Sequence, residues 1–350
     1  MPSTRSRALA LALPLTLALA ACGAGGSGSG AGGGAGDSAA GGGAGGGDGA
    51  GLQVTASFYP ITYLVERVAG DHAEVSTLTS PGVDPHDVEL TPRVVGSLGG
   101  ADLVVYAAGM QPAVDQAVGT QAADHSFDVT GAADLMAPGE SAEEHDEHAG
   151  DAEHEEHSTQ DGDDGAAEEG HDGHDHGAED PHFWLDPERY GDVAEAIGEQ
   201  LAQVDPDHAE DYRTNAAAVV ADLEALDQEL RTGLQTCESR DLVTTHEAFG
   251  YLAHRYDLHL VGITGISPES EPSPARLAEV TEQVRSLGVA AVYTEPLLPP
   301  GIAETVARET GAQVLTLDPV EGITDASAGE DYLQVMRANL AALQDGLGCS

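Results

Sequence analysis

The chain has 350 residues, of which 61 are acidic and 13 basic, so its formal net charge is −48 at pH 7. This charge excludes nucleic acid as a natural partner and argues against charge-driven binding to anionic lipid. It also favours the accumulation of small cations at the surface.

The first 22 residues have the features of an export signal. Arg5 and Arg7 precede an apolar run at 8–20, and the small-residue sequence Leu-Ala-Ala stands directly before Cys22. The run is too short to span a bilayer permanently, and the sequence at Cys22 resembles the cleavage site of a bacterial lipoprotein. We therefore expect an extracytoplasmic protein, held at the cell membrane only by a lipid on Cys22. The alternative is an ordinary secretory signal with an incidental cysteine.

Composition divides the remainder into a tether and two blocks that can fold. Residues 23–51 are mostly Gly, Ala and Ser, which predicts a flexible tether. We expect an N-terminal α/β lobe at 52–205, a spanning helix at 206–235 and a C-terminal α/β lobe at 236–350. The predicted strands, which alternate with helical patterns and so favour parallel sheets, are 52–58, 74–78, 103–106, 241–245, 259–263, 289–294 and 313–317.

A tract at 140–180 interrupts the first lobe with 18 acidic residues and no basic one. It has almost no apolar residue with which to fold, so we expect a disordered loop. The hypothesis is a low-affinity metal collector, and the alternative is a charged linker with incidental histidines. The proposed weak ligands are His145, His148, His154, His157, His171, His174 and His176.

The two cysteines beyond Cys22 are Cys237 and Cys349. Because an exported chain meets an oxidising compartment, we expect them to form a disulfide. Two free thiols or two metal ligands are the alternatives.

Candidate metal ligands follow predicted strands or precede a predicted helix. His86 lies in a loop after strand 74–78, His246 directly after strand 241–245, and Asp318 directly after strand 313–317, while His182 precedes a helix. Open parallel sheets bind ligands at the carboxyl ends of their strands, so these four side chains are expected to converge between the lobes. Three imidazoles and one carboxylate form a tetrahedral set suited to Zn²⁺. Glu295, at another strand end, is the reserve for the fourth position, and water is a further alternative.

Several motifs occur in the order in which one family has them. They are Pro85-His86 with Leu90-Thr91-Pro92, Asp180-Pro181-His182-Phe183-Trp184-Leu185-Asp186-Pro187, His246-Glu247-Ala248-Phe249-Gly250-Tyr251, the run from Ile266 to Pro274, Tyr293-Thr294-Glu295-Pro296, and Leu317-Asp318-Pro319. Together they resemble the solute-binding lipoproteins of bacterial ABC-type zinc and manganese importers, the ZnuA/TroA-like group.

The resemblance implies two α/β lobes, a spanning helix, and one metal held by His86, His182, His246 and Asp318. Manganese-type members resemble this pattern but place a carboxylate where His246 stands, so the resemblance points to zinc. It implies a monomer that delivers Zn²⁺ to a membrane permease and is not an enzyme. A zinc buffer, chaperone or adhesin and a manganese-binding homologue are the alternatives. A metallohydrolase is disfavoured because Gly250 stands where the second histidine of an H-E-x-x-H motif belongs.

Overall fold

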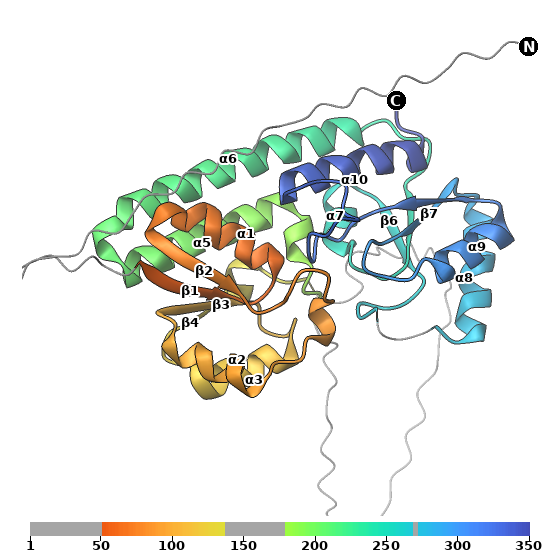
Figure 1. Cartoon of the computed structure of the whole chain (residues 1–350). Helices are drawn as coiled ribbons and strands as arrows, with labels where there is room; N and C mark the ends of the chain where they lie inside the picture. Colours follow the sequence, from red (N-terminus) through yellow and green to blue (C-terminus); the bar gives the residue numbers. More distant parts are fainter. Residues whose placement is uncertain (1–50, 137–178, 269–271) are drawn as a thin grey trace, which may run out of the picture. The chain divides into compact units, whose positions relative to one another are not determined.

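A computed structural model describes residues 51–136, 179–268 and 272–350 (Figure 1). Within it, Ala50–Ser350 is one compact unit. Cys22, the tether and the histidines of the 140–178 stretch lie outside the described residues, so what the sequence predicts for them stays a prediction. None of the helices in the three ranges combines the length and apolar character needed to cross a membrane.

The first half of this unit contains a parallel sheet in the order β2-β1-β3-β4. Its strands are β1 (Leu52–Ala56), β2 (Ala73–Thr77), β3 (Leu103–Tyr106) and β4 (Ser126–Asp128). The predictions for β1, β2 and β3 are confirmed, whereas the three-residue edge strand β4 is not expected from the sequence.

The second half repeats this arrangement in the order β6-β5-β7-β8, again with parallel neighbours. Its strands are β5 (Asp241–Thr244), β6 (His259–Gly262), β7 (Ala291–Thr294) and β8 (Gln313–Thr316). The predicted α/β class with two parallel-sheet lobes is therefore confirmed. In both sheets the strand order changes direction between the two central strands, β1 and β3 in one sheet and β5 and β7 in the other. Open α/β sheets form their binding crevices at such points.

Helices cover the sheets and connect the two halves. Those of the first half are α1 (Tyr59–Ala69), α2 (Pro92–Ser97), α3 (Pro112–Gln121), α4 (Thr130–Ala133) and α5 (Pro187–Val204). The others are α6 (Ala209–Gly233), α7 (Gly250–Arg255), α8 (Pro274–Leu287), α9 (Gly301–Thr310) and α10 (Tyr332–Leu347). Short 3₁₀ turns are η1 (Gly70–His72), η2 (Pro85–Asp87), η3 (Leu98–Gly100), η4 (Phe183–Leu185) and η5 (Pro206–His208).

The spanning helix expected at 206–235 is α6, which runs along both halves beside α10 (Figure 1). It buries Val219, Leu223, Leu226 and Leu230, which recur at the three- and four-residue spacing of one helix face. One apolar core joins this face to residues of both sheets. Because α6 packs on α1, α5 and α10, it fixes the halves on a common support.

The predicted disulfide is present between Cys237 and Cys349. Cys237 lies just after α6 and Cys349 just after α10. The bridge therefore joins the carboxyl-terminal ends of α6 and α10, which are separated by 112 residues between the two cysteines.

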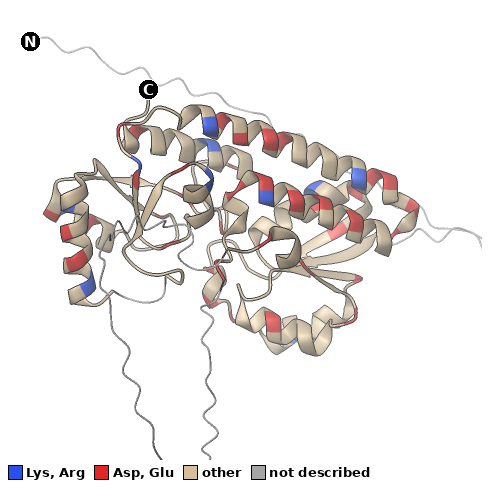
Figure 2. Cartoon of the chain, turned by 180° about the vertical axis from the view of Figure 1, so that it is seen from behind, with Lys and Arg blue, Asp and Glu red and all other residues tan. Residues whose placement is uncertain are grey.

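The negative charge is spread over the exposed helices. Asp and Glu side chains recur along them, with few Lys or Arg among them (Figure 2). Several of the arginines are themselves paired with carboxylates, for example Arg213 with Glu199 and Arg337 with Glu229. The surface is thus predominantly anionic, as the composition predicts.

Candidate metal centre

The structure brings four potential ligands together between the two halves. They are His86, His182, His246 and Glu321, and one ligand atom from each lies within 4.8 Å of all the others. No other such group of three or more His, Cys, Asp or Glu occurs in the three described ranges. The three predicted imidazoles therefore converge, but the carboxylate among them belongs to Glu321.

The ligand atoms face one another closely. Nε2 of His86 lies 3.2 Å from Nε2 of His182 and 3.2 Å from Oε1 of Glu321. The same Oε1 lies 3.3 Å from Nε2 of His182 and 3.7 Å from Nε2 of His246. Among the described residues, Nε2 of His246 is buried with no hydrogen-bond partner. An orphaned imidazole nitrogen is costly unless a ligand uses it.

His86 lies in η2, in the loop that follows β2. The turn begins at Pro85, and the carboxylate of Asp84 accepts a hydrogen bond from the His86 amide at 2.9 Å. Gln111 Nε2 donates to the Pro85 carbonyl at 3.2 Å and to the Thr79 hydroxyl at 2.9 Å, which ties this loop to the end of the strand. Local turn chemistry and one buried amide thus position this imidazole.

His182 precedes η4 and is completely buried. Its Nδ1–H donates to Oδ1 of Asp180 at 2.7 Å, and its amide donates to the same oxygen at 3.0 Å. Proton donation at Nδ1 leaves the Nε2 lone pair directed at the other ligands. Trp184 Nε1 donates to the Pro319 carbonyl at 2.7 Å, which joins η4 to the loop that carries Glu321.

His246 follows β5 and is also completely buried. Its Nδ1 lies 2.8 Å from the carboxylate of Glu295, which follows the neighbouring strand β7. The Thr244 hydroxyl donates to the His246 carbonyl at 2.6 Å. Glu295, the reserve fourth ligand in the sequence prediction, is therefore placed as the partner that orients His246.

Glu321 lies in the loop between β8 and α10 and is only 3% exposed. Val320 before it has a φ of +59°, which is unusual for a β-branched residue and costs about 1–3 kcal/mol. Asp318 Oδ1 accepts a hydrogen bond from the Val320 amide at 2.8 Å and helps to hold this turn. The reversal at Val320 directs Glu321 toward the imidazoles.

The structure does not bring the carboxylate of Asp318, the predicted fourth ligand, into the group of ligand atoms. Its backbone is instead paired with the Asn339 side chain, whose Oδ1 accepts from the Asp318 amide at 2.9 Å and whose Nδ2 donates to the Asp318 carbonyl at 2.7 Å. Sequence reasoning missed Glu321, although an acidic residue three positions further along the same loop was a signal that could have found it.

The four side chains form a strongly coupled electrostatic group. Burial would raise the pKa of the Glu321 carboxyl, but the surrounding imidazoles of His182, His246 and His86 hold that pKa well below its usual range. Burial likewise opposes protonation of His246, but the carboxylates of Glu295 and Glu321 outweigh it and raise the pKa to about 10. The pKa of His182 is also raised, because Asp180 and Glu321 outweigh burial. Without a metal, protons bound to these imidazoles therefore balance the negative charge of the carboxylates.

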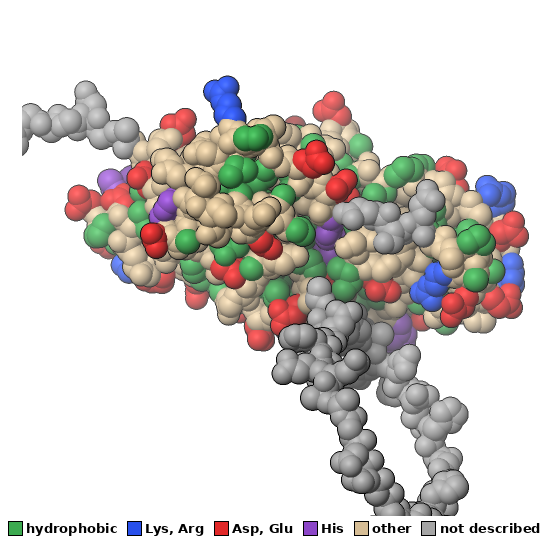
Figure 3. All heavy atoms as spheres, turned by 90° about the horizontal axis from the view of Figure 1, so that it is seen from below, with side chains coloured by type: hydrophobic (Ala, Val, Ile, Leu, Met, Phe, Trp, Pro, Cys, Tyr) green, Lys and Arg blue, Asp and Glu red, His purple; other side chains and the backbone are tan. Residues whose placement is uncertain are grey.

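The site is close to the surface on one side. His86 is its least buried imidazole, and histidine side chains are visible near the middle of the face seen from below (Figure 3). Glu321 also lines a cavity of about 200 Å³, together with hydroxyl-bearing residues such as Thr79 and Ser80.

The donor set suits a metal rather than a covalent reaction. Three neutral imidazoles and one carboxylate match the tetrahedral nitrogen-and-oxygen coordination of Zn²⁺. Carboxylates support two of the imidazoles at Nδ1, as is usual for metal-bound histidines. Four protein ligands leave no open coordination position, which is characteristic of binding sites rather than catalytic ones.

Comparisons with known proteins agree with the fold and with zinc as the metal. Residues 54–346 match the ZnuA family, described as "Zinc-uptake complex component A periplasmic". The zinc-binding lipoprotein AdcA of Streptococcus pneumoniae (strain ATCC BAA-334 / TIGR4) is 36% identical over 297 residues, covering 84% of this chain and 55% of that protein. The high-affinity zinc uptake system protein ZnuA of Bacillus subtilis (strain 168) is 34% identical over 299 residues, covering 85% of this chain and 88% of that protein.

A solved structure shows the same architecture. The Zn(II)-bound ZnuA-like domain of Streptococcus pneumoniae AdcA has a TM-score of 0.66 and 32% sequence identity, covering 85% of this chain and 99% of that domain. Fold and site together define an α/β protein with two parallel-sheet halves and, within the described residues, one buried candidate metal centre. The chain belongs to the ZnuA family of zinc-uptake components, which is a transport family. It spans only 55% of the length of the AdcA protein that it matches.

Proposed function

We propose that this protein captures Zn²⁺ outside the cytoplasm and delivers it to the permease of an ABC-type importer. The observation that carries the proposal is the buried group of three imidazoles and the Glu321 carboxylate, with ligand atoms within 4.8 Å of one another. Membership of a zinc-uptake family and the named zinc-binding relatives support the permease as partner.

The ligand types favour Zn²⁺ over harder cations. Mn²⁺ prefers sites richer in oxygen, whereas imidazoles suit Zn²⁺. The third imidazole, that of His246, therefore favours Zn²⁺ over Mn²⁺ at this site. Because raw affinity follows the Irving–Williams order, Ni²⁺ and Cu²⁺ compete in vitro. The bound metal is cargo, and its delivery requires at least one ligand to move away.

Further parts of the proposal rest on sequence. Cys22, at the end of the signal, provides the lipid anchor, and the tether at 23–51 lets a monomer reach its permease. The seven histidines of the acidic tract form weak, exchanging sites that raise the local concentration of metal. In this mechanism the ion passes from those sites to the buried centre.

The first test is zinc binding by native mass spectrometry of the chain from Leu52 onward, with and without residues 140–178. We expect one tightly held Zn²⁺ in both forms, with extra weak ions only when the tract is present. Loss of the tight ion on deletion of the tract would assign binding to the tract and contradict the buried centre.

Single substitutions test the ligands. His86→Ala, His182→Ala and His246→Ala are each expected to abolish tight binding, because three remaining ligands leave the ion exposed to water. His259→Ala is the matched control, since His259 is exposed and pairs only with Asp241. Retained affinity in all three ligand variants would overturn the proposal.

Transport is tested in cells. Deletion of the gene is expected to slow growth only in zinc-poor medium, with rescue by added zinc or by the intact gene but not by the His182→Ala variant. Normal growth and normal zinc uptake in that medium would instead support a buffer, chaperone or adhesin.

A further inference from the structure

The motif that begins with His246 ends with Tyr251, whose role is not explained by metal ligation. Tyr251 lies in α7 and is completely buried. Its hydroxyl donates to the Asp180 carbonyl at 2.6 Å and accepts from the Met136 amide at 2.8 Å. One side chain of the second half thus satisfies two buried backbone groups of the first half.

These two backbone groups are also bonded to each other. The Asp180 amide donates to the Met136 carbonyl at 3.0 Å. Met136 precedes the acidic tract, and Asp180 is its last residue, so the two residues lie on either side of all seven of its histidines in the sequence. The Tyr251 hydroxyl therefore forms hydrogen bonds with the backbone on both sides of these histidines.

Asp180 connects these hydrogen bonds to the metal centre. Its carboxylate accepts from both Nδ1 and the amide of His182, at 2.7 and 3.0 Å. The side chain of Asp180 thus orients an imidazole while its carbonyl and amide are held by Tyr251 and Met136. A displacement of the Asp180 backbone would move the acceptor of His182 as well.

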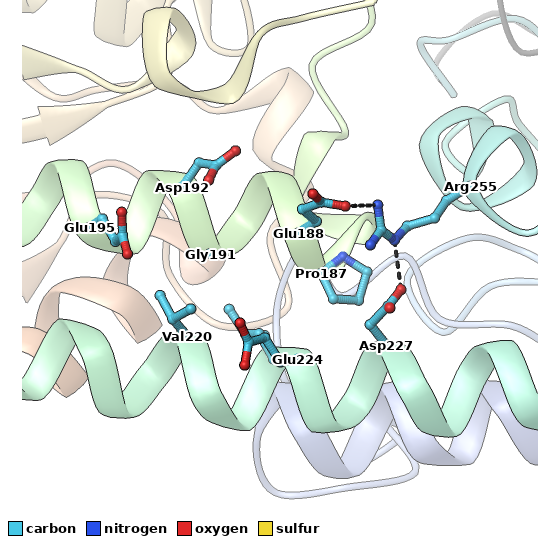
Figure 4. A pocket seen from close by; sticks show the side chains of 10 residues that line it. Pro187, Glu188, Gly191, Asp192, Glu195, Val220, Glu224, Asp227 and Arg255 are labelled. Atoms are coloured by element: carbon cyan, nitrogen blue, oxygen red, sulfur yellow. Dashed lines mark hydrogen bonds and ion pairs between the residues drawn. The ribbon is translucent and has the colours of Figure 1, made fainter.

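The helix that carries Tyr251 is itself anchored. Arg255, four residues further along α7, pairs with Glu188 of α5 and Asp227 of α6 (Figure 4). Arg189 of α5 lies over the Tyr251 ring, 5.4 Å from its centroid. The ring of Tyr251 and the helix that carries it are thus tied to α5 and α6 by contacts that do not involve the Tyr251 hydroxyl.

We propose that Tyr251 is a positioning residue of the metal centre: through Asp180 it fixes His182, and it joins that imidazole to both ends of the His-rich tract. The proposal rests on the proposed zinc-binding function. Tyr251 does not contact the metal. It acts through two hydrogen bonds whose loss leaves a buried amide and a buried carbonyl without their partner.

The first experiment is a double-mutant cycle on zinc affinity, measured by competition with a chelator in the chain from residue 23 onward, tract included. Asp180→Asn is expected to weaken binding by about 10–100-fold, the usual loss for a group that supports a ligand. Tyr251→Phe acts one bond further away, so it is expected to weaken binding less than Asp180→Asn, by at least about threefold. The double variant should bind no more weakly than Asp180→Asn alone, because Tyr251 acts through Asp180.

The matched control is Tyr212→Phe. Tyr212 is also completely buried and donates its hydroxyl to a carboxylate, Asp205, at 2.8 Å, but none of its contacts reaches the metal centre. It is expected to leave zinc affinity unchanged within about twofold. An unchanged zinc affinity in Tyr251→Phe would overturn the positioning role. So would a double variant whose fold-loss of affinity equals the product of the losses in the two single variants.

A second measurement needs no zinc and separates this proposal from the proposed function. In the zinc-free chain, the proton on Nδ1 of His182 should be observable by NMR and protected from exchange with water. Tyr251→Phe should accelerate that exchange, and Tyr212→Phe should not. Equal protection in all three chains would refute the positioning role even if zinc binds tightly. Absence of tight zinc binding in the unmodified chain would refute the proposed function while this comparison still decides the role of Tyr251.

Discussion

Zinc and protons compete for the same nitrogen atoms, and the structure sets the pH range of that competition. An ordinary imidazole has a pKa of about 6.5, so three ordinary histidines would lose zinc affinity only below about pH 6. Here the carboxylates of Glu295 and Glu321 raise the pKa of His246 to about 10 against the opposing effect of burial. At neutral pH this imidazole carries a proton that Zn²⁺ must displace.

The magnitude follows from linkage. Each proton displaced makes the apparent affinity rise about tenfold per pH unit below the pKa of its site. His246 alone therefore predicts a rise of roughly 100-fold between about pH 6 and about pH 8. The pKa of His182 is also raised. At any pH at which His182 is protonated as well, the affinity for zinc therefore depends more steeply on pH.

Calorimetry in buffers of different ionisation enthalpy measures the protons released, and chelator competition gives the affinity. We expect at least one proton released per Zn²⁺ at about pH 7.5, and an affinity that still increases above about pH 7. An affinity that is constant above about pH 7, with no proton release, would show that the imidazoles keep ordinary pKa values and would refute the electrostatic reasoning.

The zinc-free protein should respond to pH in the opposite direction. The pKa of His246 is about 10 in the folded chain and about 6.5 when unfolded, so its stabilising contribution is complete below about pH 6.5 and is lost as pH rises through about 10. The pKa of Glu321 is depressed instead, so its contribution is lost as the solution becomes strongly acidic. Thermal unfolding of the metal-free chain should therefore show a falling midpoint above neutral pH.

Further substitutions test separate parts of the structure. Glu321→Gln should weaken zinc binding by more than the ~10–100-fold typical of losing a supporting residue, whereas Asp318→Asn should weaken it less; the reverse order in chelator competition would restore Asp318 as the ligand. Replacing Cys237 and Cys349 together by Ser should lower the free energy of unfolding by about 4–5 kcal/mol in the chain-entropy model, measured by denaturant titration against the oxidised chain; a change below about 1 kcal/mol would contradict it. Trp184→Phe removes one buried hydrogen bond and should cost about 1–3 kcal/mol; an unchanged denaturation midpoint would argue against that bond.

The strand ends could be predicted because apolar runs and their boundaries are local properties of the sequence. His86 and His246 follow such runs, and His182 lies between two Asp-Pro steps, so each could be assigned to a loop at the correct edge of a sheet. The edge strand β4 could not, because Ser126–Asp128 is too short to show alternation and is defined by pairing with β3.

The hydrophobic periodicity of the sequence could not identify the fourth candidate ligand. Asp318 and Glu321 lie in the same loop, and both are buried. Which carboxylate faces the imidazoles depends on the positive φ of Val320 and on the pairing of the Asp318 backbone with Asn339. Neither feature has a sequence signature, since a β-branched residue disfavours that backbone conformation and the asparagine is distant in the chain.

The two sheets have the same strand order, and corresponding positions can be identified in them. Thr79 donates its hydroxyl to the Ser57 carbonyl at 2.9 Å, and Thr264 donates in the same way to the Thr245 carbonyl at 3.0 Å. The next residue is Phe58 in the first half and His246 in the second. The molecule thus contains two copies of one scaffold, with a metal-binding side chain at this position in only one of them.

At this position the first half contributes packing instead. The Phe58 ring meets Trp184 edge to face, with 5.1 Å between their centroids, and Trp184 in turn lies 5.3 Å from the His182 ring. For protein engineering, Phe58 marks the strand end in the first half at which a fourth imidazole could be introduced by a single substitution. For the history of the fold, the same pair shows that corresponding positions of a repeated unit can differ in role: Phe58 packs against Trp184, whereas His246 joins the candidate ligands that both halves contribute.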